Sequence, residues 1–95
     1  MEFLNKMYNK NKYIYVVFII NTHYVRWEFF DKNSKIIHLY KTLESKYNIK
    51  NCNLTINDKN IHFHFDKDKF IKKYFIYNTD ISCDVRVATD YIIEF

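Results

Sequence analysis

YIYVVFII, residues 13–20, is a run of β-branched and aromatic residues without a single charged position. Such residues are enriched in strands, and apolar side chains at successive positions are typical of a strand covered on both faces. The run is eight residues long, well short of the roughly 20 that a membrane-spanning helix needs. We therefore predict a central strand here and no contact with a membrane.

The next segment, YVRWEFF at residues 24–30, has no clear period. It fits either a second strand or an irregular crossing with a short helical turn, and residues 21–23 separate it from the first strand. Most aromatic residues of the chain fall at positions expected in the core. Trp27, beside Arg26, is the exception that we expect at the surface, where it could stack on an unpaired base.

An amphipathic helix is predicted at residues 34–48. Its apolar positions recur at spacings of three and four residues, and side-chain oxygens in residues 31–34 could cap its first turn. The apolar positions are Ile36, Ile37, Tyr40, Leu43 and Tyr47.

Strict alternation then predicts two half-buried strands, at residues 52–56 and 61–65. Residues 57–60, Asn-Asp-Lys-Asn, form the turn between them. The chain contains neither Gly nor Pro, so Asn and Asp must occupy the left-handed turn positions. A hairpin with one apolar face follows.

A second helix is expected to begin at Asp66 or Asp68 and to run to about Tyr77, with a cationic outer side. Two short strands, at residues 84–88 and 91–95, complete the chain. The predicted order is β-α-β-β-α-β-β.

These elements predict an α+β fold, a single two-layer sandwich with two helices on one face of a mixed sheet. The sandwich spans residues 12–95, and residues 1–11 form a mobile basic arm. A ubiquitin-like β-grasp is the competing topology, because strand, strand, helix, strand also fits residues 13–56. A second full helix and the absence of carboxyl-terminal glycines weigh against it.

Composition gives little sign of catalysis. The two cysteines are too few for a disulfide framework, and without glycine neither a phosphate-binding Gly loop nor a nucleophile elbow can form. His62 and His64 could hold a metal with Cys52 or Asp66, but an ordinary solvated strand face explains this spacing better. We expect no enzyme activity, no cofactor, no metal and no small-molecule substrate.

Charge indicates a polyanionic partner. Residues 1–75 carry fourteen Lys and Arg against seven acids, and the last twenty residues carry an excess of three negative charges. Lysine suits phosphate contacts that position a protein without reading sequence, so structured RNA is favoured. Four lysines lie within seven residues of the predicted second helix: Lys67, Lys69, Lys72 and Lys73.

The order of the pieces resembles the eukaryote-type large-subunit ribosomal protein twenty-two family over residues 13–95. The high Asn, Lys and Ile content, 11, 13 and 13 residues, indicates a compact AT-rich eukaryotic genome as the source. The pieces that carry the resemblance are Asn21-Thr22-His23, the helix after Asp31, Leu54-Thr55-Ile56, Lys72-Lys73-Tyr74-Phe75 and Val85-Arg86-Val87-Ala88. The sequence departs from the family at Tyr24, where the family has a proline, and in a shorter second helix.

The resemblance implies a structural protein of the large ribosomal subunit, cytoplasmic, which binds ribosomal RNA and neighbouring ribosomal proteins. The family's RNA-contacting lysines lie on the second helix. A β-grasp adaptor that recruits a partner through an exposed strand edge is the alternative. The full set of expected RNA-binding residues is Lys67, Lys69, Lys72, Lys73, Arg86, Lys59 and Lys12.

Overall fold

The computed structural model describes residues 12–75 and 82–90. The chain forms a five-stranded mixed sheet in the order β2-β1-β5-β3-β4. β1 is antiparallel to β2 and parallel to β5, and β3 is antiparallel to both β5 and β4. The strands are β1 (Tyr13–Ile20), β2 (Tyr24–Asp31), β3 (Asn53–Ile56), β4 (Lys59–Asn60) and β5 (Ser82–Ala88).

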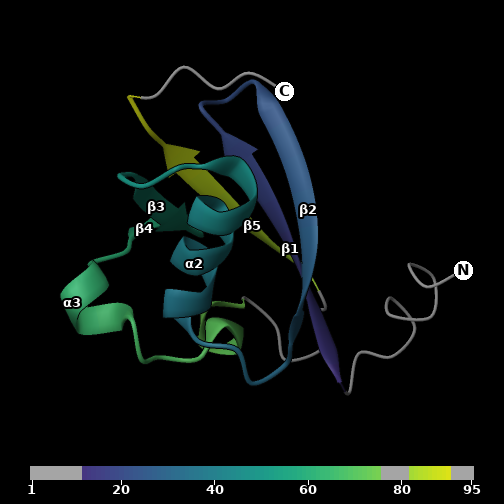
Figure 1. Ribbon diagram of the computed structural model, residues 1–95. Helices are drawn as coiled ribbons and strands as arrows, with labels where there is room; N and C mark the ends of the chain where they lie inside the picture. Colours follow the sequence, from purple (N-terminus) through teal and green to yellow (C-terminus); the bar gives the residue numbers. More distant parts are fainter. Residues whose placement is uncertain (1–11, 76–81, 91–95) are drawn as a thin grey trace, which may run out of the picture.

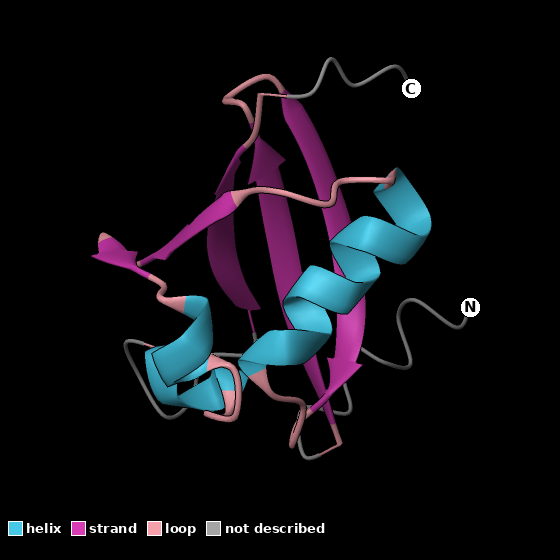
Figure 2. Cartoon of the chain, turned by 60° about the vertical axis from the view of Figure 1, so that its left-hand side comes forward, coloured by secondary structure: helices cyan, strands magenta, loops and turns pink. Residues whose placement is uncertain are grey.

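Helix α2 (Ile36–Tyr47) crosses one face of the sheet, and among the described residues no helix lies on the opposite face (Figures 1 and 2). The one-turn helix α3 (Phe63–Asp66) and the 3₁₀ helix η1 (Ile71–Tyr74) follow β4. The described part of the chain has no helix long and apolar enough to cross a membrane.

The order of elements corrects the prediction. The α+β class and the mixed sheet are confirmed, but the order is β-β-α-β-β-α-β. Residues 24–30, left open by the sequence, belong to a regular strand that pairs with β1 over eight residues. The succession strand, strand, helix, strand over residues 13–56, which the β-grasp alternative required, is present.

The prediction of a central strand at residues 13–20 is confirmed, although its two faces differ. Ile14, Val16, Phe18 and Ile20 are buried under α2, whereas the alternate residues are only half-buried. A residue period of two places these two sets on opposite faces of the sheet. The core therefore lies between α2 and one face of the sheet. None of the described helices covers the other face, which we call the open face.

The predicted long second helix is wrong. The backbone carbonyls of Lys67 and Lys69 accept hydrogen bonds from the amides of Ile37 and Ile36, each 2.9 Å long. These bonds satisfy the first turn of α2, which has no side-chain cap. Carbonyls turned toward α2 cannot continue a helix of their own, so α3 ends and η1 starts separately after Phe70.

The predicted strand at residues 61–65 is also wrong, because the chain leaves β4 at Ile61 and turns into α3. His62 precedes α3 and His64 lies within it, so they do not share a strand face. The strand at residues 84–88 is confirmed within β5. The predicted arm at residues 1–11 and the strand at residues 91–95 lie outside the described residues.

Asn and Asp make the turns, as the absence of glycine predicted. The β3–β4 hairpin has two central residues with positive φ, Asn57 at 50° and Asp58 at 64°. This pair of left-handed residues is the pattern of a type I′ hairpin turn. Asn48, at φ 56°, ends α2 in the left-handed conformation typical of helix carboxyl termini.

Candidate interaction surfaces

The structure divides the seven expected RNA-binding residues among several places. Lys12, Lys67, Lys69 and Lys72 lie at one end of the molecule, where α2 begins. The amide of Lys32 donates to the carbonyl of Lys12 (2.9 Å). The loop of Lys67 and Lys69 contacts the first turn of α2, and Lys72 Nζ donates to Asn33 Oδ1 (3.2 Å).

Two further lysines, Lys32 and Lys35, lie at this end, and sequence reasoning missed them. Both lie just before α2. The sequence signal that could have identified them was their position before the start of a predicted helix, rather than on one of its faces. We call this surface the cationic end. Its residues are Lys12, Lys32, Lys35, Lys67, Lys69 and Lys72.

Three aspartates partly neutralise the cationic end: Asp31, Asp66 and Asp68. The first turn of α2 contains no acidic residue. The cationic end is therefore suited to a polyanion, although it is not the predicted face of a single helix.

The other expected residues lie elsewhere. Arg86 pairs with Ile19 across β5 and β1, and seven residues of extended strand, about 23 Å, separate Ile19 from Lys12. Lys59 belongs to β4 at the opposite edge of the sheet from β2, and Lys73 is exposed on η1. Arg86 and Lys59 therefore lie apart from the cationic end, whereas Lys73 directly follows Lys72 of that end on η1.

Asp66 is the buried charge of the described residues, with 7% of its surface exposed. Its carboxylate accepts hydrogen bonds from Lys69 Nζ (2.8 Å), the His62 amide (2.8 Å) and the Tyr74 hydroxyl (3.0 Å). The bonds from Lys69 and His62 favour the ionised form and lower the pKa of Asp66 to about 2. This carboxylate holds α3 and η1 together, which is a structural role.

No group of three or more His, Cys, Asp or Glu side chains that could hold a metal ion occurs in residues 12–75 and 82–90. Cys52 is half-buried and Cys83 is buried. Burial raises the pKa of the Cys52 thiol to about 11, so it is protonated at neutral pH and a poor nucleophile.

The open face of the sheet carries a patch of apolar side chains. Val17 pairs with Trp27, and Ile19 pairs with Val25, in neighbouring positions of the β1–β2 ladder. Because successive side chains of a strand point to opposite faces, all four of these side chains point away from α2. Trp27 is 56% exposed and Val25 is 42% exposed. We call Val17, Ile19, Val25 and Trp27 the sheet patch.

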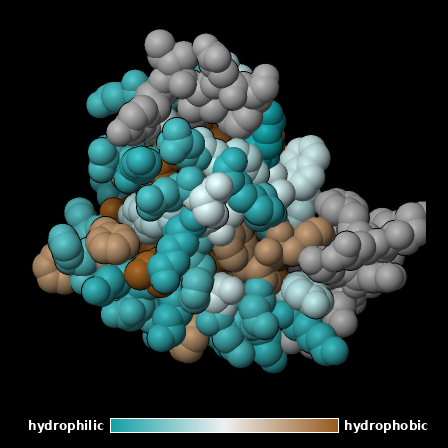
Figure 3. Space-filling model, in the orientation of Figure 1, coloured by the Kyte–Doolittle hydropathy of each residue, from teal (hydrophilic) through white to brown (hydrophobic). Residues whose placement is uncertain are grey.

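Aromatic and charged residues surround the sheet patch. The rings of Tyr15 and Phe29, one ladder position further along, lie 5.0 Å apart. On the other side, β5 places Asp84 beside Val17 and Arg86 beside Ile19. The sheet patch is thus apolar, with charged residues along β5. Figure 3 is seen from the opposite side, where α2 covers the sheet, and does not show this patch.

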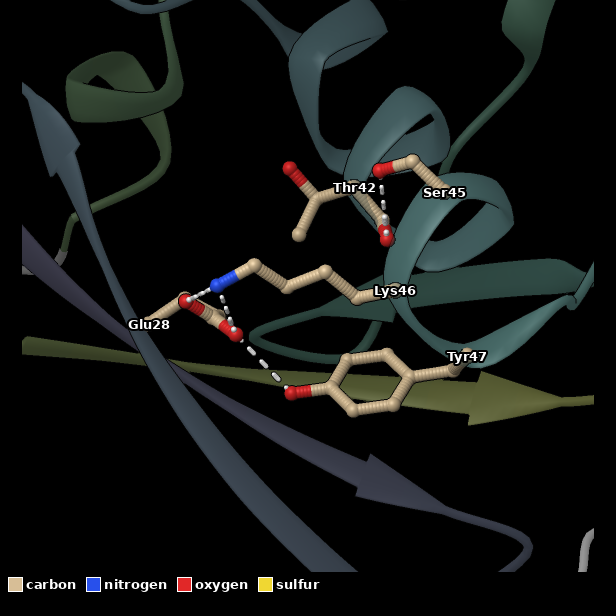
Figure 4. A network of polar contacts seen from close by, with 5 residues as sticks. All are labelled: Glu28, Thr42, Ser45, Lys46 and Tyr47. Atoms are coloured by element: carbon tan, nitrogen blue, oxygen red, sulfur yellow. Dashed lines mark hydrogen bonds and ion pairs between the residues drawn. The ribbon is translucent and has the colours of Figure 1, made fainter.

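A polar cluster ties β2 to α2 (Figure 4). Glu28 accepts two bonds from Lys46 Nζ (2.8 and 3.0 Å) and one from the Tyr47 hydroxyl (2.9 Å). Burial and the bond to Glu28 raise the pKa of Tyr47 to about 12. Because Glu28 is next to Trp27 on β2 but points to the helix side, this cluster fixes the strand that presents the sheet patch.

No protein-family model matches this sequence, and no curated protein matches it. Solved structures do match, among them an NMR structure of the Arabidopsis thaliana protein At2g32350, with a TM-score of 0.66. That match covers 85% of this chain and 90% of the plant chain at 14% sequence identity. At this identity the likeness shows that the two chains share a fold.

Proposed function

We propose that this chain is a non-enzymatic protein-interaction module of the β-grasp, ubiquitin-like type, which docks a partner protein on the open face of its sheet. The strand order β2-β1-β5-β3-β4, with parallel β1 and β5 at its centre and α2 across one face, supports the β-grasp assignment. The long second helix that weighed against this topology is replaced by α3 and η1.

The observation that carries the proposal is the exposure of Trp27 within an apolar patch. Exposed apolar side chains that adjoin one another mark interaction sites, whereas isolated ones are ordinary. Tryptophan is also among the residues that contribute most to protein interfaces. The regular β1–β2 ladder holds these side chains on a rigid surface, which lowers the entropic cost of docking.

The proposal is tested with Trp27→Ala and with Phe65→Ala as a matched control. Phe65 is 82% exposed on α3, away from the sheet face, so its removal takes an exposed aromatic ring from another surface. Each variant is immobilised, incubated with nuclease-treated extract of the source cells, and the retained proteins are quantified by mass spectrometry. Thermal melts followed by circular dichroism check that both variants fold.

We expect at least one protein to be retained by the wild type and by Phe65→Ala but to fall at least tenfold with Trp27→Ala. Trp27 is the single tryptophan of the chain. Adding the purified partner should therefore shift the tryptophan emission to shorter wavelengths as the ring leaves water, provided that the partner's own emission is subtracted. Equal retention by both variants would contradict docking on the sheet patch.

A second candidate function is binding of structured RNA, including the ribosomal RNA of the large subunit, through the cationic end. The observation in its favour is the collection of six lysines around the start of α2, where three aspartates leave a net positive charge. The ribosomal assignment itself rests on the sequence resemblance. Its expected helix of contact residues is absent, so we place it second.

RNA binding is tested by replacing Lys32 and Lys67 with Ala, against a control that replaces Lys41 and Lys50. Both double variants lose two positive charges, but the control residues lie along α2 and the loop after it. Each lost phosphate contact should reduce the slope of log affinity against log salt by roughly 0.7 to 0.9. Equal slopes in the two variants would exclude the cationic end as a specific RNA surface.

A further inference from the structure

A groove of about 790 Å³ lies between α2 and the edge of β3. This volume falls in the range of clefts that bury a drug-sized ligand. Ile37, Tyr40 and Phe63 form its apolar end. In Figure 3 hydrophobic side chains come to the surface beside α3, on the left of the view.

The groove exists because the sheet loses a strand at this point. β4 pairs only with Thr55 and Ile56, and one further bond joins the Ile61 amide to the Leu54 carbonyl (2.9 Å). At His62 the chain turns away into α3. In the described part of the chain nothing pairs beside the start of β3, where a longer β4 would continue, and this position opens into the groove.

The main chain of Cys52 faces this open position. Along a strand, successive residues direct their amide and carbonyl groups to opposite edges. The Leu54 carbonyl points toward β4, so Asn53 points toward its partner Ala88 in β5 and Cys52 points back toward the open edge. Within the described part of the chain, the amide and carbonyl of Cys52 make no hydrogen bond.

The walls of the groove indicate the chemistry of its occupant. The rings of Tyr40 and Phe63 meet edge to face, 5.0 Å apart, and Phe63 is 38% exposed. Such a surface accepts an aromatic or aliphatic side chain. The charges on the rim, Lys41, Glu44, Lys50 and Asp90, are two of each sign, so the groove, unlike the cationic end, does not select a polyanion.

We propose that this groove binds an extended, uncharged segment of a partner polypeptide, which continues the sheet beside β3. The segment hydrogen-bonds to the amide and carbonyl of Cys52 and places one aromatic or aliphatic side chain against Tyr40 and Phe63. Strand addition at an exposed sheet edge combines main-chain bonds with side-chain pockets in this way. The groove is separate from the sheet patch and does not depend on it.

The probe is a phage-displayed library of random octapeptides, selected on the folded full-length chain. Selected peptides are synthesised, and their affinities are measured for the wild type, Phe63→Ala and Phe65→Ala. The two phenylalanines lie two residues apart on α3, but only Phe63 lines the groove. Trp27→Ala serves as a second control, because it alters the sheet patch and leaves the groove unchanged.

We expect the selected peptides to share one aromatic or aliphatic position and to bind Phe63→Ala at least tenfold more weakly than Phe65→Ala or Trp27→Ala. Since Phe63→Ala could also disturb α3, the wild type supplies an independent measurement. In ¹H–¹⁵N spectra the Cys52 amide should shift downfield with bound peptide, and its hydrogen exchange should slow at least tenfold.

The proposal is overturned if no peptide is enriched, if the enriched peptides are insensitive to Phe63→Ala, or if the Cys52 amide is unchanged in shift and exchange. Protection of Cys52 by self-association at high protein concentration, without peptide, would assign the groove to a second copy and would also overturn it. Loss of binding with Trp27→Ala alone would assign the peptides to the sheet patch and would also overturn the groove proposal. The other results leave the proposed function of that patch untouched.

Discussion

The carboxylate of Asp66 holds together α3 and η1, the two short helices found where the sequence predicted one long helix. Its three bonds come from residues four positions before it, three after it and eight after it. Replacing it with Asn leaves the three donors without a charged acceptor, and we expect a loss of about 1–3 kcal/mol in unfolding free energy. Urea denaturation at pH 7 measures this.

The pH dependence gives a sharper check on the same residue. The folded pKa is about 2, below the value near 3.9 of an unfolded Asp, so the unfolded chain binds the proton more tightly. The stabilisation by Asp66 is therefore complete above about pH 4 and is lost as the pH falls toward 2. The wild type should lose more stability than Asp66→Asn over this interval, and parallel curves would contradict the assignment.

Thr22 is the second residue whose environment makes a prediction. It has a φ of 63° in the β1–β2 turn, a left-handed conformation that is costly for a β-branched side chain. Thr22→Asn should stabilise the protein by about 0.5–1 kcal/mol, which raises the melting temperature by a few degrees. Thr22→Val keeps the branch and should give no gain, so stabilisation by Val as well would show that strain at this turn is not the cause.

Among the elements, β2 depends on its link to α2 for its position. Glu28 binds both Lys46 and Tyr47, whereas the Lys46 side chain is 57% exposed. Exposed ion pairs contribute little, so Lys46→Ala should cost less than about 1 kcal/mol. Glu28→Ala removes both partners and should cost about 1–2 kcal/mol. Chemical denaturation measures the unfolding free energy of both variants, and a larger loss for Lys46→Ala than for Glu28→Ala would contradict this expectation.

At the same scale, the local sequence pattern predicted those strands and helices whose conformation does not depend on contacts with distant parts of the chain. Alternation and β-branching identified β1, β3 and β5, and the three- and four-residue spacing identified α2. The prediction for the segment after β4 was wrong, because the carbonyls of Lys67 and Lys69 bond to the first turn of α2, a contact between residues at least 30 positions apart. Residues 24–30 stayed ambiguous, since the side of β2 toward α2 mixes the charged Arg26 and Glu28 with the buried Phe30, while the opposite side carries the apolar Val25 and Trp27.

The site was predicted less completely than the fold for the same reason. A run of lysines is visible in sequence, but its arrangement at the start of α2 depends on where the chain folds back. The exposure of Trp27 was expected and is confirmed. The sheet patch around it follows only from the pairing of β1 with β2, which sets Val17 beside Trp27 and Ile19 beside Val25.

For the molecule as a whole, the two faces of the sheet differ in what they can do. One face is closed by α2, and its side chains form the core. The other carries the sheet patch, and the cationic end lies near the start of β1. A partner protein and a polyanion would therefore contact different surfaces, and variants of one surface should leave the other function intact.

The most direct test of the central claim is photocrosslinking from the sheet patch. Trp27 is replaced by benzoylphenylalanine, the folded protein is irradiated in extract of the source cells, and a second sample carries the same group in place of Phe65. Docking on the open sheet face predicts a discrete protein adduct from position 27 that survives nuclease treatment and is absent from position 65. No protein adduct at position 27, or adducts that disappear with nuclease, would contradict the account.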